Sequence, residues 1–152
     1  MRPKVFSRIL VALDGSSQSG RAGRAAIEVA EKFHARVTLA TVLSTKVGSD
    51  EAYLDSLVPK SEEGKSLLTQ IEELTREAKA RGVEAVESVS LRGPVAEAIL
   101  EYVSRNPQDL LVVGSRGLSR GSRIVLRSVS EQLIHESPCA VLVVRPARKA
   151  RT

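Results

Sequence analysis

Residues 110–130 read LLVVGSRGLSRGSRIVLRSVS, and this stretch decides the fold. It opens with an apolar run, residues 110–113, which is partly β-branched and ends at a glycine, as is typical of a buried strand. Gly114 and Gly117 follow, and by Ile124 the pattern is helical. A strand, a glycine-bearing loop and a helix N-terminus together indicate an anion site, because glycine permits close approach and the first helical N–H groups are unpaired.

Four arginines in or beside this loop carry guanidinium forks suited to phosphate oxygens: Arg116, Arg120, Arg123 and Arg127. A plainer interpretation stays open, in which the glycines allow a tight strand-to-helix turn and the arginines are solvated surface. Short glycine motifs often occur without a ligand. The density of arginines favours the anion site.

The composition bounds the class of protein. With 152 residues we expect a single domain over residues 1–146, long enough to bury a real core, and a basic tail over residues 147–152. The hydrophobic fraction is 42%, and the aromatic fraction of 3% leaves Val, Leu, Ile and Ala to build the core. No apolar run approaches the roughly 18 residues that cross a bilayer, and the N-terminus lacks a signal-peptide layout. We therefore expect a cytoplasmic protein without a membrane partner.

Cysteine and charge exclude further classes of site. Cys139 is the only cysteine and the chain has two His, so neither an internal disulfide nor a metal site is expected. Cys139 fits a small buried hydrophobe better than a catalytic thiol. The net charge of +5 is concentrated near the chain ends. Nucleic-acid binding is a minor alternative, because no aromatic residues interleave with the basic ones.

Apolar periodicity predicts alternating strands and helices along the whole chain. The expected strands are residues 7–13, 36–43, 84–91, 110–113 and 140–145. The expected helices start after an N-cap at Ser16 or Ser17, at Lys65, at Pro94 and at Ser122, and end near residues 33, 81, 105 and 136. This alternation predicts an α/β fold, an open five-stranded parallel sheet with helices on both faces.

Three features of this arrangement bear on function. Asp14 ends the first strand, where open parallel sheets bind ligands, although a turn or capping aspartate is the better interpretation of that residue alone. The polar segment 44–63 is too long for a simple connection, so it is either a functional flap or a mobile segment. If the apolar strand 140–145 forms a sheet edge, it needs a cover such as a second copy of the chain.

Almost the whole chain resembles the universal stress protein family. ILVALDGS, near the N-terminus, resembles the family's opening strand and aspartate, and VVGSRGLSRGSRIVLRSVSEQLIHESPCAVLVVR resembles its closing block. The resemblance implies a Rossmann-like or flavodoxin-like three-layer sandwich. It also implies a stress-response role and a homodimer joined through the last strand, residues 140–145.

One branch of that family binds ATP through a motif of Gly, two residues, Gly, nine residues, Gly and then Ser or Thr. Gly114, Gly117 and Ser128 match three positions of this motif, but Arg127 stands in place of the third glycine. The Arg127 side chain either blocks the approach of the phosphates or replaces the glycine as a ligand. In the second case a charge-assisted hydrogen bond would add roughly 1.5–3 kcal/mol.

The resemblance implies a nucleotide site at ten positions: Ala12, Leu13, Asp14, Val42, Gly114, Arg116, Gly117, Arg127, Ser128 and Val129. The implied cofactor is ATP with Mg²⁺ or Mn²⁺, or none if Arg127 blocks the phosphates. Our first hypothesis is a dimeric stress-response protein with a regulatory adenine nucleotide. The second is a nucleotide-free universal stress protein that acts through protein partners. A slow ATPase is third, because Asp14 is the only evident candidate base and no Walker lysine follows the glycines.

Overall fold

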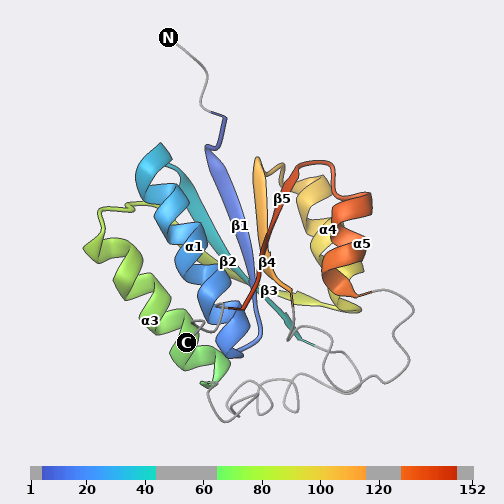
Figure 1. Cartoon of the computed structure of the whole chain (residues 1–152), viewed down its shortest axis with the longest axis horizontal. Helices are drawn as coiled ribbons and strands as arrows, with labels where there is room; N and C mark the ends of the chain where they lie inside the picture. Colours follow the sequence, from blue (N-terminus) through green and yellow to red (C-terminus); the bar gives the residue numbers. More distant parts are fainter. Residues whose placement is uncertain (1–4, 44–64, 116–127, 147–152) are drawn as a thin grey trace, which may run out of the picture.

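Five parallel strands form one sheet in the computed structural model, which describes residues 5–43, 65–115 and 128–146 (Figure 1). In chain order the strands are β1 (Arg8–Leu13), β2 (Arg36–Leu43), β3 (Val86–Arg92), β4 (Leu110–Gly114) and β5 (Ala140–Val144). Their order across the sheet is β3-β2-β1-β4-β5. The predicted five-stranded parallel sheet is therefore confirmed, with β3 and β5 at its edges.

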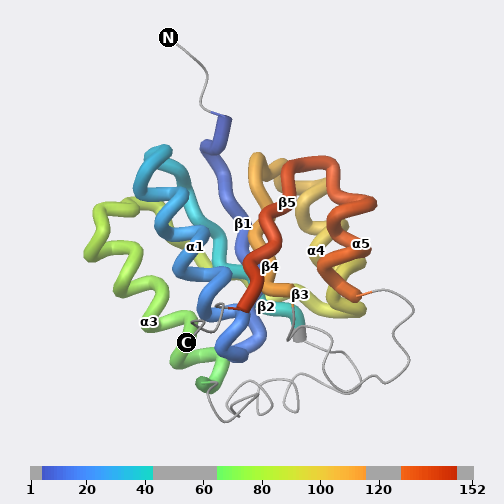
Figure 2. The backbone as a smooth tube through the Cα atoms, viewed as in Figure 1, coloured from blue at the N-terminus to red at the C-terminus, as the bar shows by residue number. Residues whose placement is uncertain are grey.

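Helices cover both faces of the sheet and complete a three-layer sandwich (Figures 1 and 2). One face carries α1 (Ser17–Phe33) and α3 (Leu67–Ala80), and the other carries α4 (Val95–Arg105) and α5 (Val129–Glu136). This layering confirms the predicted α/β class. It places the N-terminus of each helix near the end of the sheet where the strands finish.

Strand β1 lies in the middle of the sheet and is buried on both faces. Ile9, Val11 and Leu13 join the core beneath α1 and α3, whereas Leu10 and Ala12 join the core beneath α4. None of these five side chains is more than 1% exposed. Burial on both faces explains why the first strand is a continuous apolar run rather than an alternating one.

The observed starts of the helices differ in part from those that apolar spacing predicts. Ser16 is the N-cap of α1, as predicted, and its Oγ accepts from the Ser19 amide at 3.1 Å. Pro94 precedes α4 as its N-cap instead of being its first residue. The predicted start of the last helix at Ser122 is wrong, because α5 begins at Val129, after an extended residue that caps it. Residues 116–127 lie outside the described part of the chain.

Two large apolar residues on the helices are exposed. Ile134 on α5 is 53% exposed, whereas Leu133 beside it is fully buried. Phe33 is 41% exposed at the end of α1 and makes an edge-to-face contact with Phe6, with 5.3 Å between ring centroids. Cys139 is half-buried and packs against the core beneath α4 and α5, in keeping with a structural role.

Two features are absent from the described part of the chain. No described helix is both long and apolar enough to cross a membrane. The described residues also contain no group of three His, Cys, Asp or Glu side chains that could hold a metal ion. The segment 44–63 and the tail 147–152 lie outside the described residues, so what the sequence predicts for them stays a prediction.

Helix α3 fixes the loop that follows β1. The side-chain carbonyl of Gln70 accepts from the Gly15 amide at 3.0 Å and from the Ser19 hydroxyl at 2.8 Å. Its NH₂ group donates to the Ser16 carbonyl at 2.9 Å. The Lys65 amide donates to the Gly15 carbonyl at 2.9 Å. Gln70 is 5% exposed, so this is a buried polar network whose donors and acceptors depend on one another.

Gly15 is needed in this loop for two separate reasons. Its φ of 87° lies in the left-handed region that L side chains rarely adopt, and an added Cβ would stand 2.5 Å from the Lys65 carbonyl oxygen. Gly82 has a similar φ of 81° but open space around its Cα. Substitutions at Gly15 and Gly82 therefore separate the energetic cost of an unfavourable φ from the energetic cost of the close contact.

We expect Gly15→Ala to lower the free energy of unfolding by about 3 kcal/mol or more, and Gly82→Ala by about 1 kcal/mol. Both variants adopt the unfavourable φ, but only Gly15→Ala must also push the start of α3 away. Urea unfolding followed by circular dichroism measures both values. Equal losses would show that the contact between Gly15 and Lys65 is not a constraint.

Candidate functional site

The order of the strands creates a topological switch point between β1 and β4. The chain moves from β1 to β2 and β3 on one side, and then crosses to β4 and β5 on the other. In open α/β sheets, ligands bind beyond the strand C-termini at such a switch point. Val11 pairs with Val112, so Leu13 and Gly114 end these two neighbouring strands. The site residues predicted at the ends of both strands therefore lie at the same end of the sheet.

Asp14 begins the loop after β1 and is half-buried there. Its Oδ1 accepts from the Ser16 amide at 2.9 Å, and its own amide donates to the Ser19 hydroxyl at 3.2 Å. The turn role that the sequence favoured is thus present. No described residue donates a hydrogen bond to Oδ2 of Asp14, and a carboxylate oxygen can accept from a hydroxyl or amino group of a ligand.

The other predicted residues of β1 and β2 contribute less through their side chains. Ala12 is fully buried and Leu13 is 1% exposed, on opposite faces of the sheet. Their side chains pack in the cores on the two faces of the sheet, and only their main-chain groups are left for a ligand. Val42 is half-buried near the end of β2 and packs against the same core as Ala12.

The N-terminus of α5 supplies amide donors at the same end of the sheet (Figure 1). The Ser128 Oγ accepts from the Glu131 amide at 3.2 Å, and its carbonyl accepts from the Gln132 amide at 3.1 Å. The amides of Val129 and Ser130 precede these bonds, so neither has an acceptor within the helix. Two such amides at a helix N-terminus favour an anionic group.

The loop between β4 and α5 is described only at its two ends. Gly114 is buried and pairs with Val144, and the amide of Ser115 donates to the Val144 carbonyl at 3.1 Å. Arg116, Gly117 and Arg127 fall in the segment 116–127, outside the described residues. Their predicted contacts with phosphate remain predictions.

The supporting residues Ser19 and Gln70 were not identified from the sequence. Gln70 lies on the buried face of α3 with Leu67, Leu74 and Ala78, so a polar residue within an apolar stripe was the available signal. Ser19 gave no comparable signal, because serine in the first turn of a helix is common. Both hold the loop that presents Asp14. A carboxylate oxygen and helix N-terminal amides at one edge suit a ligand that has hydroxyl or amino groups at one end and an anion at the other.

Sequence comparisons agree with this architecture. The model of the universal stress protein family matches residues 6–145. The universal stress protein YxiE of Bacillus subtilis is 32% identical over 151 residues, covering 93% of this chain and 100% of the relative. A universal stress protein of Thermus aquaticus is 36% identical over 144 residues, again covering 93% of this chain and 100% of the relative.

A comparison with solved structures gives the same result. The crystal structure of a universal stress protein in complex with cAMP is 28% identical and has a TM-score of 0.71. The match covers 92% of this chain and 97% of that chain. Because the family match extends from before β1 to beyond β5 and so includes the whole sheet, the chain belongs to the universal stress protein family.

Proposed function

We propose that this chain binds an adenine nucleotide, as a regulatory ligand in a stress response, between the C-terminal ends of β1 and β4. The observation that carries the proposal is the meeting of two complementary features at one edge. Asp14 offers a carboxylate oxygen that accepts from no described residue, and the start of α5 offers amides without acceptors in the helix. A relative of the same fold, 28% identical, was crystallised with cAMP, which supports a nucleotide of this class.

ATP is the specific ligand we propose, with Mg²⁺ or Mn²⁺ as its accompanying ion. Asp14 would accept from a hydroxyl or amino group of the adenosine, and the phosphates would extend toward the loop between β4 and α5. Ser128 and Val129 begin α5 at the end of that loop. A nucleotide-free protein that acts through partners is the second candidate, because Arg127 stands where the ATP-binding motif has glycine.

We expect Asp14→Asn to weaken ATP binding by roughly tenfold or more, because the ligand loses a hydrogen bond to a charged acceptor. The substitution keeps an oxygen that can accept from the Ser16 amide, so the turn should persist. Isothermal titration with ATP, AMP and cAMP measures the affinity. Natively purified protein should also carry a nucleotide detectable by mass spectrometry.

The matched control is Asp109→Asn. The Asp109 carboxylate also accepts from main-chain amides, those of Ser7 and Arg8 at 2.8 Å each, but at the opposite end of the sheet. The Asp109→Asn variant should bind the nucleotide with unchanged affinity. Equal affinity in Asp14→Asn and the unsubstituted chain would remove Asp14 from the site, and no heat with any adenine nucleotide would reject the proposed function.

Arg127→Gly tests the departure from the ATP motif. If Arg127 is a phosphate ligand, the variant should bind ATP roughly tenfold more weakly and AMP about as well as before, because AMP does not extend as far. We propose this ligand role, since the matching positions Gly114, Gly117 and Ser128 are intact. Tighter ATP binding in the variant would show that Arg127 blocks the phosphates instead.

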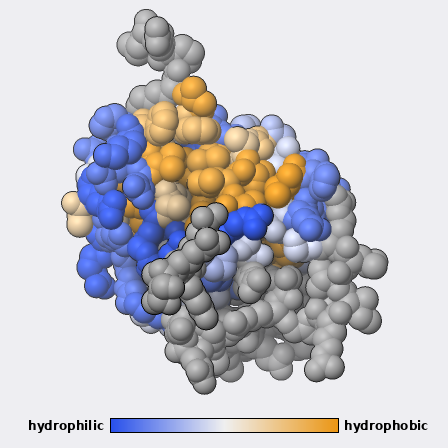
Figure 3. Space-filling model, viewed as in Figure 1, coloured by the Kyte–Doolittle hydropathy of each residue, from blue (hydrophilic) through white to orange (hydrophobic). Residues whose placement is uncertain are grey.

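We further propose that two copies of the chain associate through β5. Both β3 and β5 are sheet edges, and an unprotected edge invites pairing. Four of the seven residues of β3 (VESVSLR) are polar or charged, whereas β5 (AVLVV) is wholly apolar. Leu142 on β5 is 38% exposed, and apolar atoms form a band over this strand between α1 and α5 (Figure 3). This contrast makes β5 the edge suited to a second copy.

Leu142→Glu should convert the dimer into a monomer, because each interface would bury two uncompensated carboxylates about the two-fold axis. Sedimentation velocity at micromolar concentration measures the oligomeric state. Val5→Glu is the control, since Val5 is also apolar and exposed, at 69%, but precedes β1. A dimer that survives Leu142→Glu would place the interface elsewhere, and an unsubstituted chain that sediments as a monomer would reject the dimer.

A further inference from the structure

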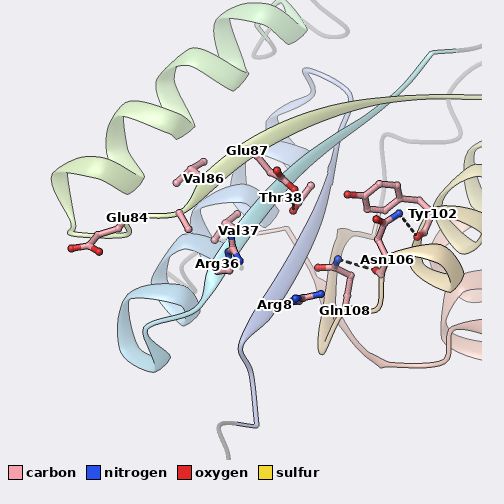
Figure 4. Close-up of a pocket in the computed structure, with 11 residues that line it drawn as sticks. Arg8, Arg36, Val37, Thr38, Glu84, Val86, Glu87, Tyr102, Asn106 and Gln108 are labelled. Atoms are coloured by element: carbon pink, nitrogen blue, oxygen red, sulfur yellow. Dashed lines mark hydrogen bonds between the residues drawn. The ribbon is translucent and has the colours of Figure 1, made fainter.

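A cavity of about 360 Å³ opens at the opposite end of the sheet from the proposed nucleotide site (Figure 4). It lies where β1, β2 and β3 begin, and the end of α4 and the residues after it form one wall. Thr38 in its lining pairs with Leu10 of the core beneath α4, which places the cavity on that face of the sheet. The volume is at the lower end of the range for ligand pockets, which suits a small metabolite.

Two arginines stand side by side in this cavity. Arg8 and Arg36 occupy paired positions at the starts of the neighbouring strands β1 and β2, and both are exposed. No described residue forms an ion pair with either guanidinium group. Two guanidinium groups that line one cavity from paired strand positions suit a carboxylate, which each can hold through parallel hydrogen bonds.

The remaining charged residues of the lining are acidic. Glu87 of β3 brings its carboxylate to the cavity, whereas Figure 4 shows the carboxylate of Glu84, just before β3, pointing away from the two arginines. The Thr38 hydroxyl donates to the Glu87 carboxylate at 3.3 Å, which orients that carboxylate next to β2. A ligand that is only anionic would meet the repulsion of Glu87, and one that is only cationic would meet the repulsion of the arginines.

The polar side chains at the end of α4 add acceptors. The Asn106 NH₂ group donates to the Tyr102 carbonyl at 3.2 Å, and the Gln108 NH₂ group donates to the Asn106 carbonyl at 3.0 Å. Because their NH₂ groups are engaged with the main chain, the side-chain oxygens of both residues remain as acceptors. They complement the acceptor oxygens of Glu87 on the far side of the cavity.

Tyr102 supplies a neutral donor between these groups. Figure 4 shows its hydroxyl pointing toward Thr38 and Glu87. Burial raises the pKa of this hydroxyl and the negative charge of Glu87 raises it further, while the Thr38 hydroxyl partly opposes the shift. The phenol therefore stays protonated at neutral pH and can donate to a ligand.

We propose that this cavity binds a small zwitterion of the α-amino-acid class, with its carboxylate on Arg8 and Arg36 and its ammonium group facing Glu87 and the amide oxygens. The separation of the two signs of charge within one small cavity carries the proposal. The polar lining favours an amino acid whose side chain is polar and uncharged. This site is separate from the proposed nucleotide site and does not depend on the proposed function.

The test titrates the ¹⁵N-labelled full chain with L-serine, L-threonine, L-asparagine and L-glutamine, one at a time. Amide resonances of cavity residues such as Val86, Glu87 and Gln108 should shift and saturate with at least one of the four. The N-acetyl and the α-amide derivatives of that amino acid each lack one charge. Each derivative should bind at least roughly tenfold more weakly than the amino acid itself.

Substitutions assign the two charges separately. Arg36→Gln should weaken the amino acid roughly tenfold, whereas Arg76→Gln, at an exposed arginine on α3 over the other face of the sheet, should leave its affinity unchanged. Glu87→Gln should weaken the amino acid but not its N-acetyl derivative. Circular dichroism melting curves confirm that each variant is folded.

Several outcomes would overturn the proposal. One is the absence of saturable shifts with all four amino acids. Another is inorganic phosphate that shifts the same resonances with equal or higher affinity, which would make this a simple anion site. A third is equal binding of the amino acid and its N-acetyl derivative to the unsubstituted chain. Added ATP should shift resonances near Asp14 instead, so a failure of this site and a failure of the nucleotide site are distinguishable.

Discussion

Burial of β1 on both faces is the constraint on which the rest of the structure depends. Its five inward side chains, residues 9–13, are almost fully removed from water. Full burial stabilises a large aliphatic side chain by about 1.5–3 kcal/mol, so a strand of this composition belongs at the centre of the sheet. With β1 in the middle, the chain must build outward on one side and then on the other. The switch point between β1 and β4 is a direct consequence of that path.

The loop after β1 shows how a distant part of the chain shapes this end of the sheet. Gly15 and Ser16 are held by the side chain of Gln70, which is more than fifty residues away in the sequence. A buried network of this kind is rigid when every polar group is satisfied, and Gly15 is the residue whose small size lets the start of α3 approach. The orientation of Asp14 therefore depends on α3 as well as on its own turn. A ligand at Asp14 would meet a carboxylate that is already in place.

The sequence predicted the sheet well because each strand is marked at both ends. The bounds of β2 agree with the prediction at both residues, and the other strands agree within two residues. The start of α5 was missed because the apolar spacing continues on both sides of Ser128, while a serine cap is a local hydrogen bond that periodicity cannot reveal. Gln70 was missed for a related reason, since its three hydrogen-bond partners come from another helix and its loop. The second cavity carries no motif, because its lining comes from four separate stretches of chain.

The two ends of a parallel α/β sheet call for different chemistry, and this chain follows that difference. Where the strands end, the helices begin, so main-chain amides of α5 can receive an anion without a dedicated side chain. Where the strands begin, the helices finish and present carbonyl groups, which repel anions. Cationic side chains can offset that repulsion for a carboxylate ligand, and Arg8 and Arg36 are the lining residues of that kind. Substituting these arginines would therefore change the second cavity without altering the main-chain geometry on which the first site depends.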